Sequence, residues 1–179
     1  MRAPVLAVVF ALGALCATGR ANAFERQWHL GGGLGATAYP NTYAIGPAIG
    51  VNGAYGISDV FDLKAELLGS LHSYDLAPHT SEHIEPFSIA AGLSYKLDVL
   101  QWIPYGSLLV GYSHVGGTLA PREAFHRDDL IAAVVLGLDY AVSRDFGLGV
   151  SLRGDLRLTT PSAGQSFTPM LRAEYHWGF

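Results

Sequence analysis

Histidines are the side chains of this 179-residue sequence that could support the widest range of chemistry. Five of the seven lie in two polar segments: His72, His79, His83, His114 and His126. With Glu82, Glu85 and Asp128 they could bind a divalent metal ion or form a pH-sensitive surface, because imidazole and carboxylate are zinc ligands and imidazole titrates near neutral pH. No spacing is diagnostic, because nothing predicts a helix around His79 and His83. Solvent-exposed loop histidines are the competing interpretation, and we predict no metal site.

A glycine triplet, Gly31-Gly32-Gly33, is the other local motif with a chemical meaning. Glycine-rich loops bind phosphates when they join a strand to a helix. This triplet lies inside a predicted strand and no helical pattern follows it. The sequence therefore disfavours a nucleotide site.

Composition narrows the class of protein that must position these residues. Half of the chain is hydrophobic and only 15% is charged, against about 25% in ordinary soluble domains. One cysteine excludes a disulfide scaffold, and 11 Lys+Arg against 15 Asp+Glu argue against a nucleic-acid partner.

The first 23 residues have the features of a secretory signal peptide. Arg2 precedes an apolar run over 5–17, and Ala21-Asn22-Ala23 matches the small-x-small pattern of a cleavage site. Cys16 follows Leu15 rather than a small residue, which disfavours lipidation. We predict a signal peptide over 1–23 and one domain over 24–179.

Alternation of apolar and polar residues dominates the rest of the chain. It is clearest at the C-terminus, where every second residue is apolar: Phe167, Pro169, Leu171, Ala173, Tyr175, Trp177 and Phe179. Side chains of a strand alternate between two faces, so this segment has one apolar and one polar face. Similar alternation predicts strands within 28–37, 43–56, 61–72, 87–97, 107–113, 130–142, 146–159 and 167–179. For 130–142 a short buried helix remains an alternative, because Ile131 and Val135 are also apolar.

A tilted strand needs about 9–11 residues to cross a bilayer, and all the predicted strands but 107–113 reach that length. Their connections alternate between tight turns (56–60, 98–101 and 143–145) and longer loops (72–85, 115–129 and 160–166), with 39–42 a short exception. Short turns at one end and long loops at the other are typical of outer-membrane barrels, which have their turns in the periplasm and their loops outside.

Aromatic residues gather at the predicted strand ends, as in the girdles that mark both edges of a membrane barrel. The expected periplasmic girdle comprises Trp28, Tyr55, Phe61, Tyr95, Trp102, Tyr140, Tyr175 and Trp177. A soluble lipocalin-like barrel is the rival architecture, but it would need its apolar face inside.

The repeated alternation and the ending Tyr175-His176-Trp177-Gly178-Phe179 resemble the small OmpA/OmpX-like outer-membrane β-barrel proteins of the Gram-negative cell envelope. The resemblance implies an all-β, eight-stranded, antiparallel up-and-down transmembrane barrel in the cell outer membrane. It also implies that Tyr175, Trp177 and Phe179 form a C-terminal signal for the barrel-assembly machinery, and that outer-membrane lipids and lipopolysaccharide surround the barrel.

Charged residues fall on the predicted inner face of this barrel. The set is Lys64, Glu66, Lys96, Asp139, Arg153, Asp155, Arg157, Arg172 and Glu174, with His176 beside them. Buried charges need partners, so we expect a cross-strand ion-pair network in which Glu66 pairs with an arginine. Such a network fills an eight-stranded lumen; a polar conduit or gate is the alternative.

Catalysis has little support in the sequence. Some barrels of this kind modify the acyl chains of lipopolysaccharide through a Ser/His/acid group. Ser113-His114 and His72-Ser73, with Asp75 nearby, are the adjacent Ser/His pairs. Neither histidine is followed at the second position by the serine of the deacylase motif. We therefore expect no enzyme and no cofactor, and a structural or surface-interaction role carried by the 72–85 and 115–129 loops. A channel or small-ligand carrier and a lipid A-modifying enzyme remain the alternatives.

Overall fold

The computed structural model describes residues 26–40, 44–77, 80–97, 101–119, 123–160 and 164–178. The expected signal peptide over 1–23 and Phe179 lie outside these residues. The start of the domain at residue 24 therefore stays a prediction. No helix in the described ranges is long and apolar enough to span a membrane.

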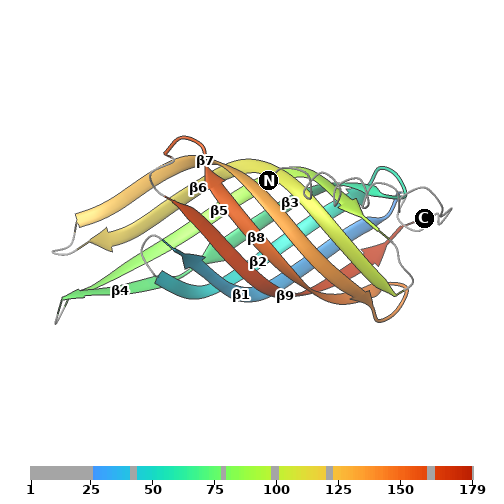
Figure 1. Cartoon of the computed structure of the whole chain (residues 1–179), viewed down its shortest axis with the longest axis horizontal. Helices are drawn as coiled ribbons and strands as arrows, with labels where there is room; N and C mark the ends of the chain where they lie inside the picture. Colours follow the sequence, from blue (N-terminus) through green and yellow to red (C-terminus); the bar gives the residue numbers. More distant parts are fainter. Residues whose placement is uncertain are drawn as a thin grey trace, which may run out of the picture.

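Antiparallel strands form one closed barrel (Figure 1). In chain order they are β1 (Trp28–Tyr39), β2 (Ala44–Gly56), β3 (Phe61–Ser70), β4 (His72–Ala77), β5 (Thr80–Lys96), β6 (Trp102–Leu119), β7 (Glu123–Ala141), β8 (Phe146–Arg157) and β9 (Gln165–Trp177). The barrel closes where β1 pairs with β9. Strands β3 and β4 both pair with β5 and are separated only by Leu71, so they act as one wall element. The predicted eight-stranded barrel is confirmed.

Alternation along each strand sorts the side chains as predicted, with apolar groups outside. Leu171 is 71% exposed, whereas the next residue, Arg172, is 8% exposed. In β3, Phe61, Leu63 and Leu67 are exposed while Lys64 and Glu66 are buried. An apolar exterior of this kind needs lipid around it, which excludes the lipocalin-like alternative.

Residues 130–141 belong to strand β7, so the helical alternative for 130–142 is wrong. Its second apolar series, Ile131, Ala133 and Val135, points inward and is almost fully buried. Ala133 and Val135 pack with Ala90 of β5 and with Tyr105 and Leu109 of β6. Both faces of β7 are therefore apolar, one toward lipid and one toward this small core inside the lumen.

The two long loops predicted over 72–85 and 115–129 are wrong. Both segments are mostly paired strand: His72 pairs with Ile84 across β4 and β5, and Leu119 pairs with Glu123 across β6 and β7. We call the strand segments 72–77, 80–86, 114–119 and 123–129 the arm, and Figure 1 shows it extending beyond the other strands at the left. Apolar–polar alternation stops in these segments, but their backbone groups still pair with the neighbouring strands, which satisfies their hydrogen bonds.

Candidate functional site

Arg153 of β8 is the centre of the inner charged network. It is 1% exposed, and its guanidinium donates from Nη1 to Glu66 Oε1 at 2.6 Å and from Nε to Asp155 Oδ1 at 2.9 Å. Its Nη2 donates to Ser88 Oγ at 3.1 Å. Lys64 Nζ lies 3.2 Å from the other Glu66 oxygen. Arg153 thus ties β8 to β3 and β5 through the middle of the barrel, and it is the arginine partner of Glu66.

Glu174 organises a second cluster, nearer the short turns. The Oε1 atom lies 3.1 Å from His29 Nδ1, 3.1 Å from His176 Nε2 and 3.3 Å from Lys96 Nζ, while Arg172 bonds Oε2. Lys96 also pairs with Asp62 at 2.7 Å. The cluster therefore joins strands β1, β3, β5 and β9.

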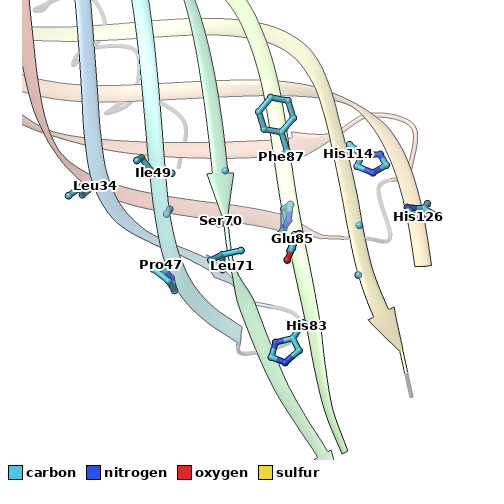
Figure 2. Close-up of a pocket in the computed structure, with 15 residues that line it drawn as sticks. Leu34, Pro47, Ile49, Ser70, Leu71, His83, Glu85, Phe87, His114 and His126 are labelled. Carbon is cyan, nitrogen blue, oxygen red and sulfur yellow. The ribbon is translucent and has the colours of Figure 1, made fainter. Parts of the chain in front are cut away.

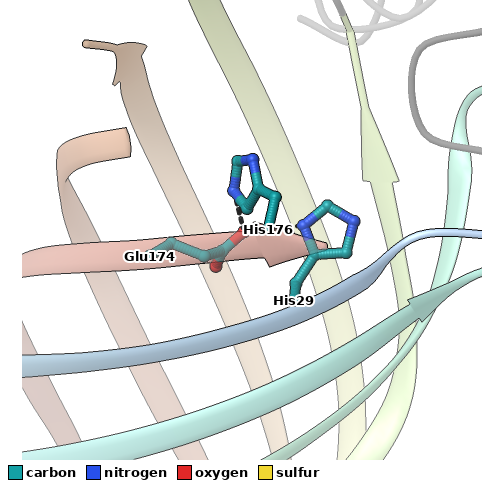
Figure 3. Close-up of side chains that lie close together, drawn as sticks. All are labelled: His29, Glu174 and His176. Carbon is teal, nitrogen blue, oxygen red and sulfur yellow. Dashed lines mark hydrogen bonds and ion pairs between the residues drawn. The ribbon is translucent and has the colours of Figure 1, made fainter. Parts of the chain in front are cut away.

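His29, Glu174 and His176 are close enough to suggest a metal site, since their ligand atoms lie within 4.8 Å of one another (Figure 3). However, Lys96 Nζ is 3.3 Å from both His29 Nδ1 and Glu174 Oε1. Its ammonium group already takes the place that a cation would need. This group of residues forms part of the ion-pair network.

Tyr105 of β6 lies between the charged network and the small apolar core of the lumen. The Arg172 guanidinium lies 4.9 Å from the centre of its ring, and Lys64 Nζ lies 5.3 Å away. Asp139 Oδ2 is 3.9 Å from Arg172 Nη1. Tyr105 was not among the predicted lumen residues, although it has the same strand parity as the buried Ile103 and Ser107.

Asp129 forms ion pairs with two arginines at the arm end of the lumen. Its carboxylate lies 2.9 Å from Arg127 Nε and 3.6 Å from Arg157 Nη1, and it accepts hydrogen bonds from Thr159 and Thr160. Sequence reasoning missed Asp129, Asp62 and His29. His29 and Asp62 have the inward parity of their predicted strands, whereas Asp129 lies at the end of the segment predicted to be a loop.

Little space is left between these side chains. Two cavities inside the lumen each measure about 20 Å³. One lies between Met170, Glu66 and Arg172. A water molecule needs about 10–15 Å³ by this measure, so each cavity has room for about one water. The described lumen is therefore filled by its own side chains.

The eight girdle residues form four ring pairs toward the short-turn end. Ring centroids are 4.8 Å apart for Trp28 and Tyr55, 5.2 Å for Phe61 and Tyr95, 4.9 Å for Trp102 and Tyr140, and 5.9 Å for Tyr175 and Trp177. The first three pairs are direct cross-strand neighbours. Tyr175 and Trp177 of the expected assembly signal point outward; Phe179 lies outside the described residues.

The outer face of the arm borders a groove of about 940 Å³ (Figure 2). His83, Glu85, His114 and His126 line its arm side, and Leu34, Ile49 and Phe87 line the side toward the apolar band. Ser73 Oγ and His83 Nδ1 are hydrogen-bonded at 3.1 Å. Polar and apolar walls thus meet at the edge of the lipid-facing surface.

Asp128 holds His114 on this face, with Nδ1 to Oδ1 at 2.7 Å. Hydrogen bonds from the Tyr112 hydroxyl and from His114 lower the pKa of Asp128 below its usual range. The carboxylate is therefore ionised at neutral pH and accepts both bonds.

His72 does not share this surface. It is buried on the inner side of the barrel, 3.0 Å from Ser70 Oγ, with its ring centroid 5.0 Å from that of Tyr39. His79 lies outside the described residues. The expectation that His72 is a loop histidine is wrong, because alternation continues past Leu71 and turns it inward.

The adjacent Ser/His pairs are not catalytic dyads. Ser113 is buried in the lumen, whereas His114 points to the outer groove. His72 points inward and Ser73 outward. Neighbouring strand residues face opposite sides, so neither serine can reach the histidine beside it.

Comparisons with known proteins place this geometry in a family. The model of the outer membrane protein beta-barrel domain matches residues 7–168. A search of curated proteins finds no match. Several solved structures share the fold. Neisserial surface protein A is 16% identical with a TM-score of 0.66, over 87% of this chain and 98% of that chain.

Two further structures are similar. Ail, the attachment invasion locus protein of Yersinia pestis, is 13% identical with a TM-score of 0.63, over 86% of this chain and 100% of that chain. The N-terminal barrel domain of Pseudomonas aeruginosa OprF is 15% identical with a TM-score of 0.62, over 86% of this chain and 98% of that chain. The family match covers most of the sequence. The chain belongs to the outer membrane protein beta-barrel domain family and is a protein of the outer membrane.

Proposed function

We propose that this barrel is non-conducting and non-catalytic, and that it presents the arm outside the membrane as an interaction surface. The filled lumen carries the proposal. Arg153 is held by acceptors on β3, β5 and β8, and the cavities beside the network have room for about one water each. Buried pairs of this kind resist opening, because breaking one leaves an uncompensated charge.

The arm supports the interaction role. It continues the sheet as paired strands beyond the apolar band, so it is a built surface rather than a set of free loops. Two structurally similar proteins carry surface or attachment in their names: Neisserial surface protein A, and the attachment invasion locus protein Ail, solved in complex with a heparin analogue. The described outer face of the arm carries carboxylates together with histidines.

The orientation follows from the two ends of the barrel. The turns at 57–60 and 142–145 are short, and the ring pairs lie on the same side. We place this end in the periplasm and the arm outside. Lipid and lipopolysaccharide then surround the barrel, and Tyr175, Trp177 and Phe179 serve recognition by the barrel-assembly machinery.

Planar-bilayer recording tests the closed lumen. The wild-type protein is expected to give no steady current. The double variant Arg153→Ala/Glu66→Ala is expected to give discrete conductance steps, because it removes the side chains that cross the lumen. A steady wild-type current that changes when Arg153 or Glu66 alone is replaced would overturn the proposal in favour of the channel.

Cysteine labelling in intact cells tests the exposure of the arm. The sequence has one native cysteine, Cys16, in the expected signal peptide. We expect His126→Cys to react with a membrane-impermeant maleimide and Ser143→Cys, in a short turn, to react only after lysis. The reverse pattern would contradict the orientation.

The absence of catalysis is tested by the lipid A mass spectrum of cells that overexpress the protein. A change in this spectrum would support an enzyme instead.

A further inference from the structure

Gly116 lies between outward-facing residues of the two strands that neighbour it in the arm. In the sheet register, Gly116 of β6 pairs with Glu85 of β5 on one side and with His126 of β7 on the other. His114, the next outward residue of β6, pairs with Asp128. Figure 2 shows His114 and His126 near each other on neighbouring strands, with Glu85 on the adjoining strand β5.

The two imidazoles approach the space above this glycine. If residue 116 had a Cβ atom, it would lie 3.6 Å from His114 Nε2 and 4.0 Å from His126 Nδ1. The rings are stacked, with centroids 5.7 Å apart. Because residue 116 has no side chain, the space between the two nitrogens is open to the groove.

Asp128 determines which nitrogen of His114 can bind a ligand. An ionised carboxylate only accepts hydrogen bonds, so the 2.7 Å contact places the ring proton on Nδ1. His114 Nε2 then presents its lone pair toward the space above Gly116. A carboxylate that fixes a histidine in this way is a usual companion of metal-ligating imidazoles.

We propose that His114 and His126 bind a divalent late first-row metal ion, of which Zn²⁺ is the probe, with Asp128 as a positioning residue. Glu85 would become the third protein ligand by turning its side chain toward Gly116. Two imidazoles and one carboxylate are an established ligand set for zinc, with the remaining position open to water. Imidazole also favours zinc, copper and nickel over magnesium and calcium. The site would give the arm a metal ion as a ligand. This proposal does not depend on whether the lumen is closed.

Neighbouring groups do not compete for this position. The described cation nearest in sequence, Arg127, points to the inner side and pairs with Asp129. His83, on the same outer face, is engaged by Ser73. This contrasts with the His29, Glu174 and His176 cluster in the lumen, where Lys96 fills the cation position.

Calorimetric titration with ZnCl₂ tests the site in tag-free protein in detergent micelles. We expect one saturable site in the wild type and at least a 100-fold weaker affinity in His114→Ala or His126→Ala. Asp128→Asn should weaken binding about 10- to 100-fold, as loss of an outer-shell carboxylate usually does. His83→Ala is the matched control, because it removes a histidine from the same face, and its affinity should equal that of the wild type.

A second variant separates loss of the site from loss of the fold. Gly116→Leu keeps every ligand but fills the space between the imidazoles, so zinc binding should be lost while the heat-dependent gel mobility of the folded barrel is retained. Copper(II) electron paramagnetic resonance gives an independent signature. The wild-type spectrum should show coupling to two nitrogens, His126→Ala to one, and Asp128→Asn an altered coupling with the same fold.

Two results would overturn the proposal. One is the absence of saturable zinc binding in the wild type. The other is binding that His114→Ala, His126→Ala and Gly116→Leu leave unchanged. Neither result affects the conductance and surface-labelling experiments, so the proposed function is tested independently of the metal site.

Discussion

The lumen and the outer face of the arm use the same residue types in opposite ways. In the lumen, His29 lies beside Glu174 and Lys96, and the carboxylate is surrounded by cations and imidazoles. On the arm, His114 lies beside one carboxylate, Asp128, and its other nitrogen faces open space. A histidine next to an acid thus belongs to a filled network in one place and to an open surface in the other.

Solvent access explains the difference. A buried charge in the lumen needs partners, so charged and polar side chains crowd together there and leave little space. On the arm, water completes the hydrogen bonds, and a glycine beside two imidazoles can remain uncovered. The lumen therefore contributes to stability, and the arm has the freedom to bind.

Removing the central arginine of the lumen should have the largest effect. Arg153→Met leaves Asp155 and Glu66 without their main cation, and we expect it to lower the free energy of unfolding by about 3–5 kcal/mol. Equilibrium urea unfolding in lipid vesicles measures this value.

Arg157→Met is the control for this loss. It removes the same residue type from an inward position of the same strand. However, Arg157 lies 3.6 Å from its acid, Asp129, and this carboxylate keeps a closer cation, Arg127 at 2.9 Å, when Arg157 is removed. We therefore expect Arg157→Met to lower the free energy of unfolding by at most about 1 kcal/mol. Equal losses in the two variants would show that losing the nearest cation is not what destabilises Arg153→Met.

The sequence predicted the barrel well, because an apolar exterior and a polar lumen leave period-two alternation in almost every strand. Leu171 and Arg172 point to opposite sides for this reason. The arm could not be predicted in the same way. Around Gly116 the pattern ends, and strand pairing there depends on the neighbouring chain segments, which a local pattern does not contain.

The same limit applies to the inner network. Parity predicted that Glu66 and Arg153 face inward, but not the height of each residue along the barrel. Height depends on strand tilt and register, so the sequence could not choose among Arg153, Arg157 and Arg172 as the partner of Glu66. The carboxylate of Asp62 and the ring of Tyr105 were missed for a similar reason, because nothing local shows which inward residues meet.

Filling the space beside Tyr105 should have an intermediate effect. The ring of Tyr105 lies across Gly137, where an added Cβ would overlap it. Gly137→Ala should therefore displace the ring from Arg172 and cost about 1–3 kcal/mol, as overpacking usually does. Chemical denaturation followed by tyrosine and tryptophan fluorescence measures the loss.

Gly69→Ala is the matched control for this variant. Nothing lies within 4 Å of the position that its Cβ would occupy. We expect its stability to equal or slightly exceed that of the wild type, because alanine restricts the unfolded chain more than glycine does. A destabilised Gly69→Ala with an unaffected Gly137→Ala would mean that the packing of Tyr105 does not matter.

The smallest expected effect is on the arm. Asp128 is exposed, so Asp128→Asn should lower the unfolding midpoint at neutral pH only slightly even though it weakens the proposed metal site.

The Asp128 carboxyl should titrate below its usual pKa of 3.8, because the Tyr112 hydroxyl and His114 hydrogen-bond its ionised form. A lowered folded-state pKa favours the folded arm above the unfolded pKa, and this preference is lost as the pH falls through the folded value. NMR of the carboxyl carbon measures the midpoint, and Tyr112→Phe should raise it. A wild-type midpoint at or above 3.8 would remove the basis for treating Asp128 as the acceptor that orients His114.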